Sequence, residues 1–345
     1  MSIQLHRREV IFTKIDIEMK DIYTRLKMLG ISRAFARKFI LPEWWEDSMA
    51  SVPANRSLAE IILSRQLGLD LATLRDPEGR LHLRPELSVR FKKREGVEEG
   101  QLDVAQALAS RLATLATLCI DKPFRQSQLT ARQIRQTILK KGSPWVGMDT
   151  LLDFCWDLGI PVVQLCQVPT GSKKMDGMAC WQEGHPVIVI PCQRQYTGWH
   201  AFILAHELGH VMCGHISPDS AYVLDDKVDR SQQQFQEQEA NAFARELLMG
   251  HRDMMVAPAS SYLTGGELAH TAQSLGEKMQ IDPGVIILNY SWNQKFFPVA
   301  MIALKELSQQ SDAASRYQAR YSHLDLEMLP EDSQRVFESL TASGN

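Results

Sequence analysis

A histidine pair in the segment WHAFILAHELGHVMCGH, residues 199–215, most constrains the fold of this chain. His206 and His210 are four residues apart, so on an α-helix both imidazoles lie on one face, about one turn from each other. The apolar residues before His206 predict that this helix is buried. Burying two histidines together with a glutamate and no metal would be costly. The sequence therefore predicts a metal-binding helix.

Glu207 completes an H-E-x-x-H motif in this helix. In such motifs two neutral histidines bind Zn²⁺, and the glutamate accepts a proton from a water molecule at the metal. His215 could supply a third ligand, but it follows His210 by five residues, one fewer than in the extended form of the motif. We therefore expect His215 just beyond the end of the helix.

A second helix, at residues 236–249, offers a better third ligand. Glu237 and Asn241 are four residues apart and share a face, so Glu237 can reach the zinc while Asn241 orients a histidine. Glu239 points elsewhere on this helix and is the alternative ligand. Three protein ligands leave the fourth position of a tetrahedral zinc ion open to water, as in catalytic sites.

Three segments together resemble the ImmA/IrrE family of bacterial zinc metallopeptidases: FILAHELGHVMCGH at 202–215, EANAFARELLM at 239–249 and LGEKMQIDPGVIILNY at 275–290. The resemblance covers about residues 125–290. It places the two histidine ligands, the catalytic glutamate and the distal glutamate of the family on His206, His210, Glu207 and Glu237. One position departs from the family pattern, because Gly250 follows ELLM where the family usually has proline.

The resemblance implies an intracellular zinc-dependent endopeptidase that cleaves a helix-turn-helix transcriptional repressor and so derepresses a linked operon. Operons of this kind serve DNA-damage and other stress responses, mobile-element control and antiphage defence. A different class of function stays open, namely a zinc-stabilised DNA-binding or antitoxin-like regulatory scaffold without proteolytic activity. Glu207 favours catalysis, because a scaffold would need only the metal ligands.

The expected fold class is α+β, with a zincin-like metalloprotease core, a small mixed sheet and helical regions at both ends. Runs of β-branched residues within 158–169 and 185–191 predict strands. A chain of 345 residues is expected to form more than one domain. We divide it into an N-terminal helical accessory domain at 1–120, with a helix-turn-helix outline at 22–40, the zinc metallopeptidase domain at 121–256 and a C-terminal helical region at 257–345.

Residues 122–147 form a basic window without any Asp or Glu, although the chain carries a net charge of -3. Unpaired cations of this kind could bind the phosphates of single-stranded DNA as an activator, although a solvated helix face paired with acids elsewhere explains them equally well. The candidate nucleic-acid-binding residues are Arg125, Arg132, Arg135, Lys140 and Lys141.

The six cysteines are scattered, without a C-x-x-C pair, so we expect thiols and no disulfide framework. A thiolate could occupy the open zinc position and inhibit the site, and Cys119, at the end of a predicted helix, is the candidate. The start of the sequence lacks the apolar core of a signal peptide, and no run approaches the roughly 18 apolar residues of a membrane span. We therefore expect a cytoplasmic protein that is not in a membrane.

Overall fold

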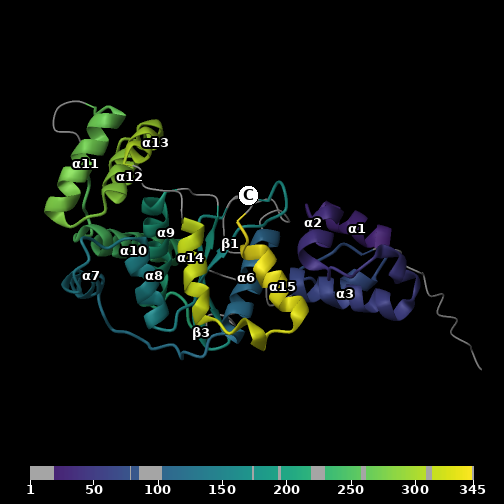
Figure 1. Ribbon diagram of the computed structural model, residues 1–345. Helices are drawn as coiled ribbons and strands as arrows, with labels where there is room; N and C mark the ends of the chain where they lie inside the picture. The colour runs from purple at the N-terminus through teal and green to yellow at the C-terminus, as the bar shows by residue number, and fades with distance from the viewer. Residues whose placement is uncertain are drawn as a thin grey trace, which may run out of the picture.

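The chain folds into helices around one small sheet, as seen in a computed structural model (Figure 1). The structure describes residues 19–77, 79–84, 103–172, 175–192, 196–218, 230–257, 262–307 and 313–343. The sheet lies in the middle of the molecule, with helices α11 to α13 at one end and α1 to α3 at the other (Figure 1). The predicted α+β class is confirmed.

Short helices form the N-terminal end of the described chain. They are α1 (Met19–Met28), α2 (Arg33–Phe35), the π-helix η1 (Ala36–Ile40), the 3-10 helix η2 (Asp47–Ser51), α3 (Pro53–Leu67) and α4 (Leu71–Arg75). A turn at Gly30 joins α1 to the continuous segment of α2 and η1. The helix-turn-helix outline is thus present, although its second helix is partly π-helical.

The sheet has three strands in the order β1-β3-β2: β1 (Val162–Leu165), β2 (Met178–Gln182) and β3 (His185–Pro191). β1 runs parallel and β2 antiparallel to β3, so the predicted mixed sheet is confirmed. Because β1 is buried along its length and β3 is buried from Pro186 onward, helices cover both of their faces. β2 has β3 as its one neighbour among the described strands and lies at an edge.

Three helices precede the sheet along the chain, α6 (Asp103–Leu118), α7 (Ala131–Lys140) and α8 (Met148–Asp157), and two follow it directly, α9 (Thr197–Met212) and α10 (Arg230–Met249). α6 packs against all three strands, whereas α9 packs against β2 and β3 and also against α8 and α10. The histidine-bearing helix α9 is therefore held between the sheet and α10.

The C-terminal part is helical, as predicted. Its elements are α11 (Gly265–Met279), α12 (Pro283–Asn293), α13 (Phe297–Glu306), α14 (Ala313–Arg320), the short 3-10 helices η4 (Tyr321–His323) and η5 (Leu326–Met328), and α15 (Glu331–Thr341). The first three pack on one another, and α12 also contacts α9. α14 and α15 return to the sheet at β1. The domain boundaries stay a prediction.

The expectation that all six cysteines are thiols is wrong, because Cys166 and Cys192 form a disulfide. The two residues directly follow Leu165 and Pro191, which are paired neighbours on the parallel strands β1 and β3. Their Cα atoms lie 4.6 Å apart, although 26 positions separate them in the sequence. Since disulfides are rare in cytosolic proteins, this pair does not favour the expected location. Among the described helices, none combines the length and apolarity that crossing a bilayer requires.

Candidate metal centre

The predicted histidine pair lies in the C-terminal half of α9, with both side chains mostly buried. The Nε2 atoms of His206 and His210 are 3.2 Å apart, so the two rings point to one place. Helix α9 ends at Met212, which confirms that His215 lies beyond it. The helix spacing read from the sequence thus produces the expected shared face.

Glu237 of α10 lies against both histidines. Its Oε2 is 3.4 Å from Nε2 of His206, and its Oε1 is 3.7 Å from Nε2 of His210. α10 can bring this carboxylate so close because Gly209 of α9 has no side chain: a Cβ atom there would lie 3.1 Å from the backbone of Ala240. The glycine inside the H-E-x-x-H motif therefore sets the distance between the two helices.

These three side chains fit a metal ion. Two ligand atoms that each lie about 2.0–2.2 Å from a tetrahedral zinc ion are roughly 3.3–3.6 Å apart. The three distances in the structure, 3.2, 3.4 and 3.7 Å, are close to this range. Two imidazoles and a carboxylate are also a donor set that zinc accepts. His206, His210 and Glu237 could thus hold one zinc ion.

The charges around the histidines favour a cation. Burial alone lowers the pKa of His206, but the hydrogen bond to Glu237 and the negative charge of Glu207 outweigh burial and raise it above its usual value. A hydrogen bond with the side chain of Asn241 also raises this pKa. No hydrogen bond reaches the buried Nδ1 of His206 from the described residues. The site therefore stabilises positive charge despite its burial.

The side chain of Glu207 is buried beside the start of strand β2. A Cβ atom on Gly177, the residue before β2, would lie 2.5 Å from Oε1 of Glu207 and 2.8 Å from Cγ2 of Ile203. The edge of the sheet thus runs directly beside the predicted catalytic carboxylate. The sequence does not point to Gly177, because nothing local in MDGMACW indicates which side chain it meets.

Replacing Gly177 with alanine is expected to displace the Glu207 carboxylate and to lower peptidase activity at least about 10-fold while the metal content stays unchanged. The new methyl group would overlap Oε1, and misplacement of a catalytic group by about 1 Å costs up to 10²-fold. Cleavage rate and metal content, measured on the same preparation, test this. Gly266→Ala is the matched control, since a Cβ there meets only the flexible end of Glu306. Equal loss in both variants would exclude a specific role of Gly177.

Glu239, the alternative ligand, lies apart from the three converging atoms. Its Oε2 is 3.0 Å from Nε2 of His215, and Nδ1 of His215 is 3.1 Å from Nδ1 of His210. Cys213, His215 and Glu239 also form a second group whose donor atoms lie within 4.8 Å of one another. Burial and the charge of Glu239 raise the pKa of Cys213 to about 11. The pairing of His215 with Glu239 was not predicted.

The structure does not bring Cys119 to the histidines. It is fully buried at the end of α6, where its carbonyl oxygen accepts a hydrogen bond from the backbone N–H of Asp325, and it belongs to neither of the two groups of metal-binding side chains among the described residues. Burial and the charge of Asp325 raise the pKa of its thiol to about 11. Such a thiol is a poor source of thiolate. We therefore do not retain Cys119 as an inhibitory ligand.

Arg135 is wrongly placed among the nucleic-acid-binding candidates. Its guanidinium is buried and donates to the carbonyl oxygens of Leu247, Leu248, Met279 and Gln280. It thereby joins the C-terminal ends of α10 and α11, whose last carbonyls lack partners within their helices. The sequence could not reveal this role, because the carbonyls come from segments more than 100 residues away.

The Arg135→Met variant is expected to lose at least about 2 kcal/mol of stability, because carbonyls at both helix ends lose a charged donor. Chemical denaturation of the metal-free protein measures this. Arg132→Met on the exposed side of α7 serves as the control and should change stability by less than about 0.5 kcal/mol. Similar losses in the two variants would show that the Arg135 contacts contribute little.

The other cations of the basic window are exposed: Arg125, Arg132, Lys140 and Lys141. Lys122 pairs with Asp157 at 3.4 Å. Four side chains of this window are therefore open to a partner.

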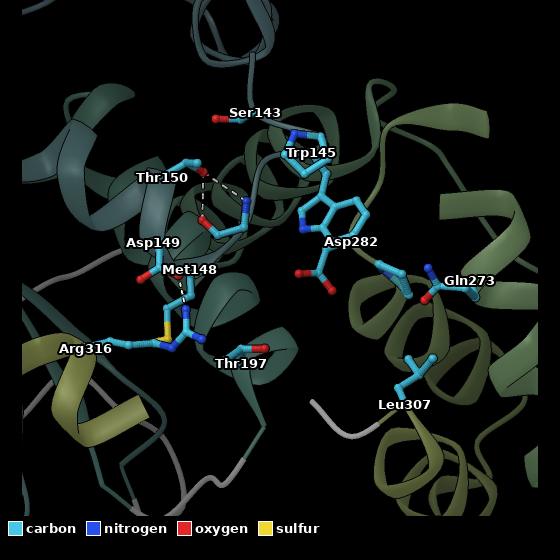
Figure 2. A pocket seen from close by; sticks show the side chains of 13 residues that line it. Ser143, Trp145, Met148, Asp149, Thr150, Thr197, Gln273, Asp282, Leu307 and Arg316 are labelled. Carbon is cyan, nitrogen blue, oxygen red and sulfur yellow. Dashed lines mark hydrogen bonds and ion pairs between the residues drawn. The ribbon is translucent and has the colours of Figure 1, made fainter. Parts of the chain in front are cut away.

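A separate pocket of about 490 Å³ lies at the N-terminal end of α9, where Thr197 is part of its wall (Figure 2). Asp149 and Arg316 point toward one another on one side, and Gln273 and Leu307 lie on the other (Figure 2). His206 is nine residues further along α9, about 14 Å away at the usual helical rise. This pocket is therefore not the histidine site.

Comparison with known proteins agrees with the geometry. A search of curated proteins and a search of solved structures each gave no match. Residues 157–272 match a family described as the IrrE N-terminal-like domain, Peptidase M78. The matched part contains β1 to β3, α9 and α10, and with them both histidines and Glu237. The match supports an assignment of this part of the chain to the ImmA/IrrE family of metallopeptidases.

Proposed function

We propose that the chain is a zinc-dependent endopeptidase whose metal is held by His206, His210 and Glu237. The observation that carries the proposal is the convergence of two Nε2 atoms and one carboxylate at separations of 3.2–3.7 Å. A zinc ion in this place would polarise the scissile carbonyl group and make a water molecule more acidic.

Glu207 acts as the general base and then as the general acid. It is next to His206 but outside the converging group, so its carboxylate is not needed as a ligand. Its burial beside Gly177 fixes the side chain. In hydrolysis the carboxylate takes the proton of the attacking water and delivers it to the amine of the leaving peptide.

The substrate binds in an extended conformation beside strand β2. This strand has one neighbour among the described strands, and Gly177, the residue before it, lies beside Glu207. A peptide that adds to this edge would form backbone hydrogen bonds along β2 and place a peptide bond near the glutamate. This arrangement fits a protease that cuts an extended segment of a protein.

A helix-turn-helix transcriptional repressor is the proposed substrate, and derepression of a linked operon is the proposed outcome. Support comes from the resemblance of the motifs to the ImmA/IrrE family. Such a substrate would place the enzyme in the cytoplasm. Single-stranded DNA is the proposed activator, and its candidate contacts are Arg125, Arg132, Lys140 and Lys141, all exposed.

The experiment incubates the purified chain and its Glu207→Gln variant with the helix-turn-helix protein encoded by the neighbouring gene, with and without single-stranded DNA. Intact mass spectrometry of the products should show one cut that depends on Glu207. Faster cutting with DNA that disappears at high salt would support the activator. A zinc-loaded protein that never cuts would favour the regulatory scaffold instead.

A further inference from the structure

His215 and Glu239 form a chain of contacts that begins at the proposed metal ligand His210. Nδ1 of His210 lies 3.1 Å from Nδ1 of His215, and Nε2 of His215 lies 3.0 Å from Oε2 of Glu239. Both distances are those of hydrogen bonds. These contacts therefore link α9 to α10 through His215, the residue after the turn at Gly214.

The direction of these hydrogen bonds follows from the metal site. If Nε2 of His210 binds the metal, its Nδ1 must carry the proton and can only donate. Nδ1 of His215 must then accept, which leaves the proton of His215 on Nε2, where it donates to the carboxylate of Glu239. Each neutral ring uses its single N–H, and the acceptor at the end is a carboxylate.

The His215 ring is also held in place by features other than these two side-chain contacts. Its side chain is 6% exposed, and its backbone N–H donates to the carbonyl oxygen of His210 at 2.9 Å. No comparable hydrogen bond reaches Nδ1 of His206 among the described residues. Among the described residues, a side-chain contact at Nδ1 is thus recorded for His210 and not for His206.

We propose that His215 and Glu239 are positioning residues that hold His210 in the tautomer that binds metal and increase its basicity. The proposal rests on the metal site proposed above. Partners behind a metal-binding histidine typically contribute 10- to 100-fold in metal affinity. His215 and Glu239 thus take part in metal binding without touching the metal.

The same residues could be read as a second metal site, because Sγ of Cys213 lies within 4.8 Å of donor atoms of His215 and Glu239. Both ring nitrogens of His215 are already engaged, one with His210 and one with Glu239. A metal on Nε2 of His215 would remove the proton donated to Glu239. The geometry therefore favours the hydrogen-bonded chain over a second ion.

The test measures zinc affinity of the full chain by competition with a chromogenic chelator, together with the melting temperature of the metal-free protein. His215→Ala and Glu239→Ala should bind zinc 10- to 100-fold more weakly than wild type, and a cooperative melting transition of the metal-free variants should show that both are folded. Glu239→Gln keeps an acceptor oxygen and should recover most of the affinity. Cys213→Ala is the control and should bind one zinc with wild-type affinity.

Two outcomes would overturn the proposal alone. One is a His215→Ala variant whose zinc affinity equals that of wild type. The other is two zinc ions in wild type that fall to one in Cys213→Ala, because the cluster would then be a metal site. A wild-type protein that binds no zinc would instead overturn the proposed function, and the positioning role with it.

Discussion

Replacing Glu207 with glutamine should lower the cleavage rate by at least about 10²-fold, and up to about 10⁴-fold, while the metal content stays at one ion per chain. Glutamine has nearly the shape of glutamate, so it should fit the buried place beside Gly177. It cannot accept the proton of the attacking water. Because Glu207 lies outside the group of His206, His210 and Glu237, the metal should remain.

Product formation followed by mass spectrometry and metal content by plasma mass spectrometry measure the two effects on the same sample. Glu331→Gln, an exposed change of the same chemistry on α15, should be as active as wild type. Full activity of Glu207→Gln would show that another group transfers the proton. Loss of the metal in this variant would show that Glu207 is itself a ligand.

Replacing Glu237 with alanine should abolish stable zinc binding. The change removes the only carboxylate of the converging group and leaves two histidines. A ligand that binds only the folded protein stabilises it by about 4 kcal/mol at a concentration 1,000 times its dissociation constant. The melting temperature of wild type should therefore fall when a chelator removes zinc, whereas that of Glu237→Ala should not change.

Gln238→Ala is the matched control for this variant, because Gln238 is the exposed next residue of α10. It should bind zinc and respond to the chelator as wild type does. If Glu237→Ala kept one zinc per chain and Glu239→Ala lost it, Glu239 would be the third ligand. The position of His215 would then need to change, since it now contacts Glu239.

The sequence predicts those parts of the fold and the site that depend on the spacing of residues only a few positions apart. The four-residue spacing of His206 and His210 and the apolar residues before them were enough to predict a buried helix and a shared ligand position. The helix face shared with Asn241 favours Glu237 over Glu239, and the structure places Glu237 beside both histidines. The β-branched runs likewise predicted β1 and β3.

The features that the sequence did not predict depend on contacts between distant segments. Cys166 and Cys192 meet only because β1 and β3 are parallel neighbours in one register. Charge alone groups Arg135 with its basic neighbours, whereas its packing between the ends of α10 and α11 decides its role. Gly177 and the His215–Glu239 contact are recognised only once β2 and α10 are placed against α9.

The proposed metal site can be tested most directly by anomalous X-ray scattering from a crystal of the wild-type protein, with data collected on both sides of the zinc absorption edge. We expect one anomalous peak, about 2.0–2.2 Å from Nε2 of His206, Nε2 of His210 and a carboxylate oxygen of Glu237. No peak at this position, or a peak held by Cys213, His215 and Glu239 instead, would show that the catalytic metal site proposed here is wrong.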